Sequence, residues 1–462
     1  MSVWGRFLFR VTQRIRRSRT LDILQAVRSE PYQSREEILE RQFLLLSRLL
    51  TMAEAHVPYY REMFRSLGIH SYDIRNLGDF SSLPVLTKDI IRDRLDDLVR
   101  EDVPKSELTA RYSGGSTGVP LKFYRSRVDL DACEAGTSRN CLQSGWEPGD
   151  MVAYFWGFDD QLYAMSSWEF ELRQRLRRMY QFDPFHSGAE QMDRWLVKWK
   201  QIQPRIAVGY ASTVARFADY IETTGRQVSP LLGVFTTAEK LYPVQRETIA
   251  RVFGCRVYDM YGSSEVNNIA CTCSHGNMHV NVDHVVLEVD DADLLPGQPA
   301  SLIVTPLSSE VMPFIRYRNE DCGELLQGSC DCENQFPLMK LNISRVSDNF
   351  TLPSGEVIHG EFFTHLMYGS KGIAMFQFHQ IALDSITLWI VPKPGHTAAR
   401  EEAMRLVVER VEKLDTTRTL RIQVQETDAI PLSRTGKHRF TISDVRAASA
   451  SRSSSDLESE LA

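Results

Sequence analysis

The chain has 462 residues, 43% of them hydrophobic, which is enough to fill more than one buried core. Its formal net charge of −6 excludes a whole-molecule basic field of the kind that attracts nucleic acid. Eight cysteines in a chain of this length do not make a disulfide scaffold, so we expect reduced thiols in a cytoplasmic protein.

The first 34 residues form a basic amphipathic segment. Five apolar residues recur there at helical spacing: Trp4, Phe7, Leu8, Val11 and Ile15. Arginines take another face of the same helix, so it either docks on its own protein or rests on an anionic membrane surface. No apolar run approaches the roughly 18 residues of a membrane-spanning helix, and we expect no removable signal peptide. The cytoplasm is therefore the expected location, with the inner face of the membrane as the alternative.

The remaining elements are predicted in chain order. Residues 35–68 are strongly periodic and predict helices. From about 105 to 345, short apolar runs such as "MVAYFWG" and "RIAVGY" alternate with helical stretches, which favours an α/β body with mixed sheets. A charged helix at 399–414 between two strand-like segments predicts a small α+β domain. The Ser- and Ala-rich C-terminal tail is expected to be disordered.

The stretch "RYSGGSTGVPLKFY" at 111–124 has the composition of a phosphate-binding loop. Small residues let backbone N–H groups approach a phosphate closely, and the hydroxyls of Ser113, Ser116 and Thr117 add donors. The spacing does not fit the Walker pattern, because no Gly-Lys-Ser/Thr follows the glycines. Taken alone, the stretch is explained equally well as a glycine- and serine-rich hairpin without a ligand.

Three later motifs carry charged side chains at strand ends or in a loop. In "VYDMYGSSEV", Glu265 follows an aromatic-glycine turn, where a carboxylate is suited to hold Mg²⁺ against phosphate oxygens. Asp321 in "PFIRYRNEDCGEL" is suited to accept two ribose hydroxyls, and Lys437 in "IPLSRTGKHRF" presents a cation in a glycine-containing loop. Each also has a purely structural explanation: a capping acid, a surface ion-pair network or a solvated basic loop.

Together and in this order, the four motifs resemble the adenylate-forming superfamily of acyl-CoA synthetases. Within it, "RYSGGSTGVPLKFY", "TTAEKLYPVQRETIARVFGCRVYDMYGSSE" and "PFIRYRNEDCGEL" are similar to the phenylacetate-CoA ligases and to their relatives from capsular-polysaccharide gene clusters. The resemblance covers roughly residues 35–445. It implies a large multi-subdomain adenylation domain at 35–343, a small mobile domain at 344–446 and a tail at 447–462.

The resemblance implies a role for each matching residue. Residues 113–118 would wrap the β- and γ-phosphates of ATP, Asp259 would face the adenine amino group, and Tyr261 would stack on the adenine. Glu265 would hold Mg²⁺, and Lys437 would be the mobile catalytic lysine. The whole implied ATP-binding set is Ser113, Gly114, Gly115, Ser116, Thr117, Gly118, Ala238, Glu239, Asp259, Tyr261, Gly262, Ser264, Asp321 and Arg345.

The implied function is ATP-dependent activation of an aryl or small organic acid to an acyl adenylate, then transfer to coenzyme A. This is an AMP-forming acid-thiol ligase, in which positioning and electrostatic stabilisation dominate catalysis. Ser344 and Ser347 replace the glycine and first acid of the family's Gly-Arg-x-Asp-Asp hinge, so an amine, hydroxyl or carrier-protein thiol is the alternative acceptor. A non-catalytic nucleotide-binding protein is the second alternative. A peripheral membrane contact and a homodimer are left open.

Four aromatic residues either line an acyl pocket or pack in the core: Tyr154, Phe155, Trp156 and Tyr210. The sequence does not decide between these two roles.

Six of the eight cysteines fall between residues 255 and 332. The stretches "CTCSHGNMH" and "CDC" offer two Cys/His clusters that, on neighbouring hairpins, can make a tetrahedral zinc site. The spacing alone leaves Cys271 and His275 open as ligands, whereas the resemblance favours Cys273, His279, Cys330 and Cys332. Such a zinc would be structural, because four protein ligands leave no position for water. Buried reduced thiols are the alternative, and that role is expected for Cys133, Cys141, Cys255 and Cys322.

Overall fold

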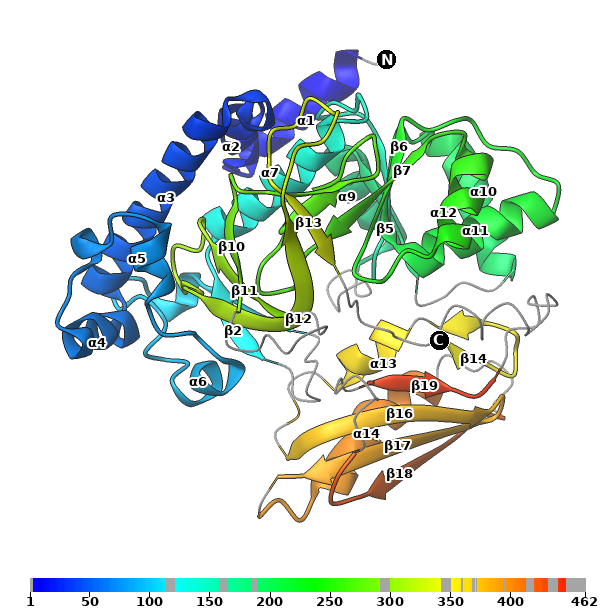
Figure 1. Ribbon diagram of the computed structural model, residues 1–462. Coiled ribbons are helices and arrows are strands. Elements are labelled where there is room, and N and C mark those ends of the chain that lie inside the picture. Colours follow the sequence, from blue (N-terminus) through cyan, green and yellow to red (C-terminus); the bar gives the residue numbers. More distant parts are fainter. Residues whose placement is uncertain are drawn as a thin grey trace. The chain divides into compact units, whose positions relative to one another are not determined.

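The computed structural model describes residues 3–113, 121–157, 165–184, 189–290, 300–341, 350–358, 360–367, 370, 372–393, 395–412, 419–430 and 439–445. They form two compact units: one contains nearly all described residues up to 341, and the other contains those from 350 onward (Figure 1). Several predicted features lie outside the described residues, namely Gly114 to Gly118, the hinge with Ser344, Arg345 and Ser347, the catalytic Lys437, and the tail.

The first unit begins with helices. These are α1 (Val3–Ile15), α2 (Thr20–Val27), the turn Glu30–Tyr32, α3 (Arg35–His56) and α4 (Pro58–Leu67). α3 begins at Arg35 because Ser34 Oγ accepts from the Glu37 N–H while the Glu37 carboxylate accepts from the Ser34 N–H. Shorter helical turns follow at Ser71–Asp73, Leu77–Ser81, Lys88–Asp93 and Lys105–Glu107.

The first unit is organised around one sheet in the order β10-β11-β12-β13-β9-β8-β7-β6-β5-β3-β4. Its parallel half consists of β3 (Val152–Phe155), β4 (Met179–Phe182), β5 (Ile206–Tyr210), β6 (Gly233–Thr237) and β7 (Arg256–Tyr261). Between these strands lie α9 (Ser167–Arg177), α10 (Ala189–Ile202), α11 (Ala211–Thr223) and α12 (Pro243–Phe253). The carboxyl ends of parallel strands share one edge of the sheet, which is where such folds bind ligands.

The other half of the sheet is antiparallel. It consists of β8 (Ala270–Thr272), β9 (Met278–Val280), β10 (Val285–Val289), β11 (Ala300–Pro306), β12 (Tyr317–Leu326) and β13 (Leu338–Leu341). α3 packs over this half, and Gln42 Nε2 donates a 2.7 Å hydrogen bond to the Val285 carbonyl. A separate hairpin of β1 (Thr109–Tyr112) and β2 (Lys122–Arg125) precedes α7 (Arg127–Leu142).

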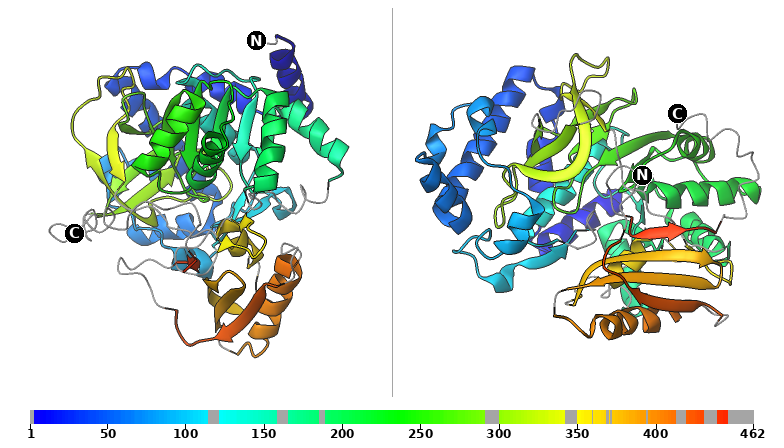
Figure 2. Two further views of the ribbon diagram at one scale, coloured as in Figure 1. Left: turned by 90° about the vertical axis from the view of Figure 1, so that its right-hand side faces the viewer. Right: turned by 60° about the horizontal axis from the view of Figure 1, so that its bottom comes forward.

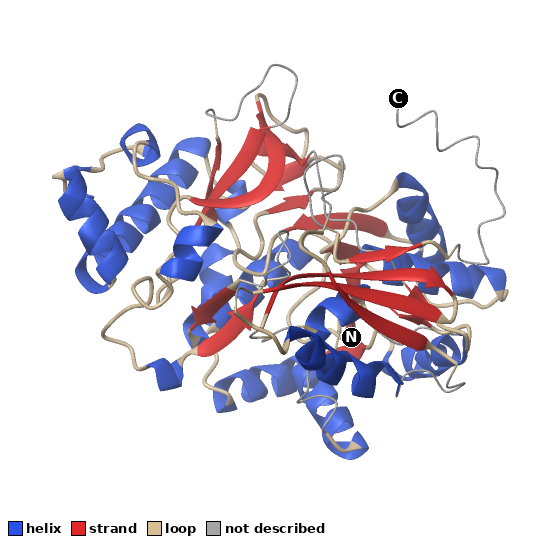
Figure 3. Cartoon of the chain, turned by 90° about the horizontal axis from the view of Figure 1, so that it is seen from below, coloured by secondary structure: helices blue, strands red, loops and turns tan. Residues whose placement is uncertain are grey.

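The second unit is a four-stranded sheet in the order β18-β17-β16-β19 with α14 (Ala399–Glu412) packed against it (Figure 3). The strands are β16 (Ile373–Ala382), β17 (Ser385–Pro392), β18 (Arg421–Glu426) and β19 (Thr441–Ser443), accompanied by β14 (Phe350–Thr351), β15 (Val357–Ile358) and α13 (Gly360–Leu366). The predicted strand–helix–strand group is β17–α14–β18, whose strands pair in parallel. The predicted α/β class with mixed sheets is confirmed.

Candidate functional site

The predicted ribose and adenine residues meet in the first unit. The Tyr261 hydroxyl, at the end of β7, donates a 3.1 Å hydrogen bond to Asp321 Oδ2 on β12 and accepts one of 2.8 Å from Asn319 Nδ2. In the sheet, β8, β9 and β13 separate these two strands, so this half of the sheet curls back on itself, as the bent β12 in Figure 1 shows. The sequence motif therefore assembles from segments 60 residues apart.

Asn319 and Tyr317 belong to this site although the sequence reasoning did not select them. Asn319 and Asp321 on β12 both bond the Tyr261 hydroxyl, and Tyr317, two positions earlier on the same strand, bonds Glu265. That period-two pattern in "YRNED" was the signal that would have found them.

Glu265 is buried, with 1% of its surface exposed, just beyond β7. Its Oε1 accepts a 2.9 Å hydrogen bond from the Tyr317 hydroxyl, and Arg125 Nη2 holds the Glu265 backbone carbonyl at 2.7 Å. Its Oε2 is buried without a hydrogen-bond partner among the described residues. Leaving a buried carboxylate oxygen without a donor is costly unless a cation or ligand completes it. The site thus fits the Mg²⁺ ligand that the sequence predicts.

The turn between β7 and Glu265 leaves little room for larger residues. A Cβ on Gly262 would lie 2.9 Å from the Asn268 backbone nitrogen, so glycine is required for this close approach. The turn is closed by Ser263 Oγ, which accepts a 3.0 Å hydrogen bond from the Val266 N–H. The side chain of Ser264 remains exposed, as a contact to a phosphate requires.

Asp259 lies on β7 directly opposite Thr236 on β6. Thr236 Oγ1 donates a 3.1 Å hydrogen bond to Asp259 Oδ1, and the Asp259 N–H donates one of 2.7 Å to Thr272 Oγ1. Burial raises the pKa of Asp259 to about 6, and the bond from Thr236 opposes this shift. The carboxyl group therefore changes its charge close to neutral pH. Its ionised form is the better acceptor for an adenine amino group.

Ala238 and Glu239 follow β6, and their structural roles differ. Ala238 adopts a left-handed backbone conformation with φ of +68°, which is strained for a residue with a Cβ. Glu239 Oε2 accepts a 2.8 Å hydrogen bond from the Ser212 N–H in the first turn of α11. The carboxylate thus caps this helix, and its charge suits the positive end of the helix dipole. The Glu239 side chain thus has a structural role, and the nucleotide contact of this stretch stays a prediction from the resemblance.

Ser113 closes the base of the predicted phosphate loop. It is fully buried, its Oγ accepts a 3.0 Å hydrogen bond from the Leu121 N–H, and its own N–H donates to the Leu121 carbonyl at 2.9 Å. These two bonds pin the ends of the loop together. The hydroxyl of Ser113 thus has a structural position, and the predicted phosphate contacts depend on residues outside the described part of the chain.

The four candidate pocket aromatics divide into two groups, because successive residues of a strand face opposite sides. Phe155 is fully buried among Phe182, Trp195 and Phe217, which is the core role of the two that the sequence left open. The other three form an aromatic ladder, which we define as Tyr154, Trp156 and Tyr210; Tyr210 is buried, with 2% of its surface exposed, and Tyr154 packs against the core cluster that contains Trp146 and Val208.

The aromatic ladder stands at the carboxyl ends of β3 and β5. Trp156 stacks on Tyr154 at a centroid distance of 5.7 Å and on Tyr210 at 4.5 Å. Burial raises the pKa of the Tyr154 phenol, so the ladder stays uncharged. Gly209 lets the two strands approach, since a Cβ there would lie 2.3 Å from the Phe155 carbonyl oxygen. Core packing therefore accounts for Tyr210 and Tyr154, and the half-buried Trp156 is the ladder residue whose ring is left for a role in an acyl pocket.

Three of the predicted zinc ligands gather at one place. The ligand atoms of Cys273, Cys330, Cys332 and His275 all lie within 4.8 Å of one another. His279 Nε2 lies 3.3 Å from Cys332 Sγ, so both histidines that the sequence offered are near the thiols. Three soft sulfur ligands and an imidazole are the donor set that zinc prefers.

The two histidines differ in their surroundings. His279 is buried, and its Nδ1 donates a 2.8 Å hydrogen bond to the Phe336 carbonyl, which leaves the Nε2 lone pair directed at Cys332. Such a carbonyl contact orients a ligating imidazole. His275 is exposed. Cys271 instead packs in an aromatic core and accepts a hydrogen bond from Gln143 Nε2, away from the cluster.

All eight cysteines fall in the described part of the chain, and none of them forms a disulfide there. Cys133 and Cys141 are buried, while Cys255 and Cys322 are half-buried, in keeping with packing roles. Burial raises the pKa of Cys255 to about 12, so this thiol stays protonated at neutral pH.

Known proteins resemble both units. Residues 350–444 match the family model of the CapK C-terminal domain. Protein CapK of Staphylococcus aureus is 24% identical over 398 residues, which cover 84% of this chain and 85% of CapK. The phenylacetate-coenzyme A ligase of Escherichia coli is 28% identical over 312 residues, which cover 64% of this chain and 68% of the ligase. The chain is thus similar in sequence to CapK and to the phenylacetate-CoA ligases.

The fold agrees with this relationship. A crystal structure of 2-hydroxyisobutyryl-CoA ligase, in complex with 2-HIB-AMP and CoA in the thioesterification state, has a TM-score of 0.58 to this chain at 19% identity. The match covers 90% of this chain and 92% of that ligase. The predicted resemblance to the adenylate-forming superfamily is confirmed. Among the helices of the described residues, none combines the length and the apolar content needed to cross a membrane.

Proposed function

We propose that this chain is an AMP-forming acid-thiol ligase, which activates a carboxylic acid with ATP and transfers the acyl group to coenzyme A. The observation that carries the proposal is the arrangement of two buried acids, Glu265 just beyond β7 and Asp321 inside β12 rather than at the strand end that the sequence predicts. Glu265 has one oxygen without a protein donor, and Asp321 is held by Tyr261 close by in the same unit. The names of the relatives, phenylacetate-CoA ligase and 2-hydroxyisobutyryl-CoA ligase, support the same reaction.

In the first half-reaction, an oxygen of the substrate carboxylate attacks the α-phosphorus of ATP. The bond from that phosphorus to the bridging oxygen breaks, and pyrophosphate leaves with the negative charge. The protein contributes position: Tyr261 stacks on the adenine, Asp259 accepts from its amino group, and Asp321 accepts from the ribose hydroxyls. Mg²⁺, when bound, supplies positive charge for the departing pyrophosphate, and Glu265 is the residue that would hold it.

Lys437 would complete this half-reaction by donating hydrogen bonds to the α-phosphate and carboxylate oxygens. It lies outside the described residues, so this role rests on the sequence motif alone. In the second half-reaction, the sulfur of coenzyme A attacks the acyl carbon and AMP leaves. The altered hinge with Ser344 and Ser347 makes another acceptor the main alternative for this step.

The aromatic ladder indicates an acid with a flat or apolar acyl group. Trp156 lies in the centre of the ladder and is half-buried, so one part of its ring remains available to a ligand. A Trp156→Ala variant should raise KM for the preferred acid more than it raises KM for ATP.

We also propose that Cys273, His279, Cys330 and Cys332 hold a structural zinc ion. The support is the closeness of the three thiols and the orientation of His279 by the Phe336 carbonyl. The ion would join the β8–β9 hairpin to the segment between β12 and β13.

The decisive experiment is ATP–pyrophosphate exchange measured across a panel of carboxylic acids, with Lys437→Ala as the control variant. Exchange that depends on one class of acid and is lost in Lys437→Ala supports the ligase. Exchange at background for every acid would overturn it in favour of a non-catalytic nucleotide-binding protein. Mass analysis then identifies the acceptor: a coenzyme A thioester supports the full reaction, and exchange without any thioester indicates a different acceptor.

A further inference from the structure

Helix α1 docks on the first unit through its less apolar side. The residues that face the body are Gly5, Phe9 and Gln13, which follow one another at intervals of four and are all buried. A Cβ on Gly5 would lie 3.0 Å from the Arg178 guanidinium, so the helix approaches this side chain closely. Figure 2 shows α1, dark blue at the N-terminus, on the outside of this unit beside α9.

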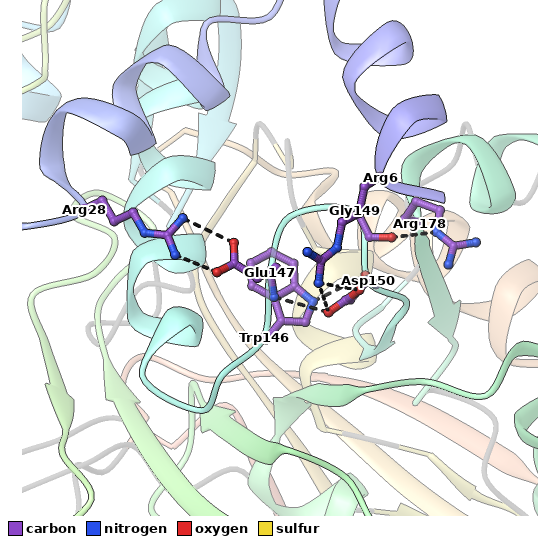
Figure 4. A network of polar contacts seen from close by, with 7 residues as sticks. All are labelled: Arg6, Arg28, Trp146, Glu147, Gly149, Asp150 and Arg178. Atoms are coloured by element: carbon purple, nitrogen blue, oxygen red, sulfur yellow. Dashed lines mark hydrogen bonds and ion pairs between the residues drawn. The ribbon is translucent and has the colours of Figure 1, made fainter. Parts of the chain in front are cut away.

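An ion pair of Arg6 holds α1 in this orientation, and two contacts of neighbouring residues hold the loop on which it docks (Figure 4). Arg6 forms a 3.4 Å ion pair with Asp150, and Arg178 Nε donates a 2.9 Å hydrogen bond to the Gly149 carbonyl. A Cβ on Gly149 would lie 2.7 Å from the Arg6 Cα, so the backbone of α1 packs directly against the backbone of this loop. Arg28, just after α2, adds a 2.6 Å ion pair with Glu147 in the same loop.

As a result, the apolar stripe of α1 faces away from the body. Phe7 is 59% exposed, Leu8 is 40% exposed and Ile15 is 77% exposed, and Val11 lies between them on the same side. A surface helix normally turns its apolar stripe toward the core. Here the structure does the reverse, which excludes the simpler expectation that this stripe serves to dock the helix on its own protein.

Charge and a neighbouring helix extend this surface. Arg10 and Arg14 are exposed on the flank of the stripe, and the first 19 residues contain six arginines and no acidic residue. α9 packs beside α1 and exposes Trp168 at 67% and Leu172 at 49%, one turn apart. An exposed apolar stripe flanked by arginines, with a tryptophan nearby, is the composition of helices that lie in a membrane interface.

We propose that α1 is an interfacial anchor that holds the first unit on an anionic lipid bilayer. The apolar stripe enters the boundary between headgroups and acyl chains, and the arginines meet anionic headgroups. Charge complementarity selects this partner, because Arg10 and Arg14 lie on one flank of the stripe and residues 1–19 contain no acidic residue that could pair with the same helix of a second copy. The inference goes beyond the ligase reaction and does not depend on it.

The test is sedimentation of the full chain with vesicles of phosphatidylglycerol and phosphatidylcholine in equal parts, compared with phosphatidylcholine alone. The wild-type chain should bind the anionic vesicles, and F7S/I15S should lower its partition coefficient by about tenfold or more. R10E/R14E should do the same at low salt, since it reverses two charges and so changes the net charge of the helix by four units. V197S/V244S is the matched control, because Val197 is 60% exposed and Val244 is 68% exposed on other helices, and it should bind like the wild type.

Three results would overturn the proposal. They are no binding of the wild-type chain to anionic vesicles, equal binding to neutral vesicles, and equal losses in V197S/V244S and F7S/I15S. Light scattering after size exclusion tests whether a second copy of the chain covers the stripe instead of a bilayer. A wild-type dimer that F7S/I15S converts to monomer would assign the stripe to that second copy. Unchanged melting midpoints show that the variants fold. ATP–pyrophosphate exchange without vesicles should not differ between the variants. A failure of the membrane proposal would therefore leave the proposed ligase activity untouched, and the reverse also holds.

Discussion

The Tyr317 hydroxyl donates a 2.9 Å hydrogen bond to Glu265 Oε1, and both side chains are buried. Tyr317 begins the antiparallel strand β12, whereas Glu265 follows the last parallel strand, β7. This bond ties the two halves of the sheet together at the point where ATP would lie. It also orients the carboxylate, so that Oε2 is the oxygen left for a cation.

Glu265→Gln should remove the charge that holds Mg²⁺ while preserving the bond from Tyr317, since an amide oxygen still accepts it. We expect acid-dependent ATP–pyrophosphate exchange to fall roughly 10²-fold, and raised Mg²⁺ to restore part of it. Tyr317→Phe keeps the charge and loses only the orientation, so its loss should be about tenfold. Equal activity of Glu265→Gln and the wild type at limiting Mg²⁺ would contradict the assigned role.

The raised pKa of Asp259, about 6, predicts a pH dependence of ATP binding. If the ionised carboxylate accepts from the adenine amino group, KM for ATP should rise about tenfold between pH 7 and pH 5. Asp259→Asn should flatten this part of the profile, measured at saturating acid and Mg²⁺. A profile that keeps the same slope in Asp259→Asn would assign the titration to another group.

The same group predicts a stability effect of definite sign. The folded chain binds the Asp259 proton more tightly than the unfolded chain, because burial raises the pKa above its ordinary value. The contribution of Asp259 is therefore most favourable below about pH 4 and is lost as the pH rises to about 6. In urea unfolding, the unfolding free energy of Asp259→Asn relative to that of the wild type should increase as the pH rises through this interval, and it should stay constant above it.

Local patterns predicted much of this molecule. The helices that begin at residue 35 and the strand–helix–strand group of the second unit both follow from residues close together in the chain. The resemblance, and not a local pattern, predicted that Tyr261 and Asp321 share one site. Local patterns could not do so, because β12 reaches β7 only through the curl of the sheet. The use of Glu239 as a helix cap, and the outward stripe of α1, depend on contacts between distant segments that periodicity does not encode.

The choice between His279 and His275 can be settled by metal content. Purified chain should carry about one zinc per molecule, and His279→Gln, like Cys330→Ser, should lower this content and the melting midpoint together. His275→Gln is the matched control and should retain zinc, because its ring is exposed. Loss of zinc in His275→Gln with retention in His279→Gln would reverse the assignment, and wild-type protein without zinc would reject the site.

Arg139 and Asp283 form a buried ion pair that supports this region. Arg139 Nη2 donates to Asp283 Oδ1 at 2.9 Å, both side chains are less than a tenth exposed, and the guanidinium lies 5.1 Å from the centre of the Phe336 ring. Arg139→Met would leave the carboxylate buried without its cation, and we expect a loss of about 3–5 kcal/mol in unfolding free energy at pH 7.

This loss should depend on pH and on Asp283 itself. Burial already raises the pKa of Asp283, and the Arg139 charge opposes that shift, so removing the arginine should raise it further. The protonated acid is neutral and tolerates burial, so the deficit of Arg139→Met should shrink as the pH falls from 7 toward 5. Adding Asp283→Asn should likewise recover part of the lost stability, at every pH in this range. A deficit that is independent of pH and unchanged in the double variant would show that Arg139 acts by packing on Phe336 rather than by pairing with Asp283.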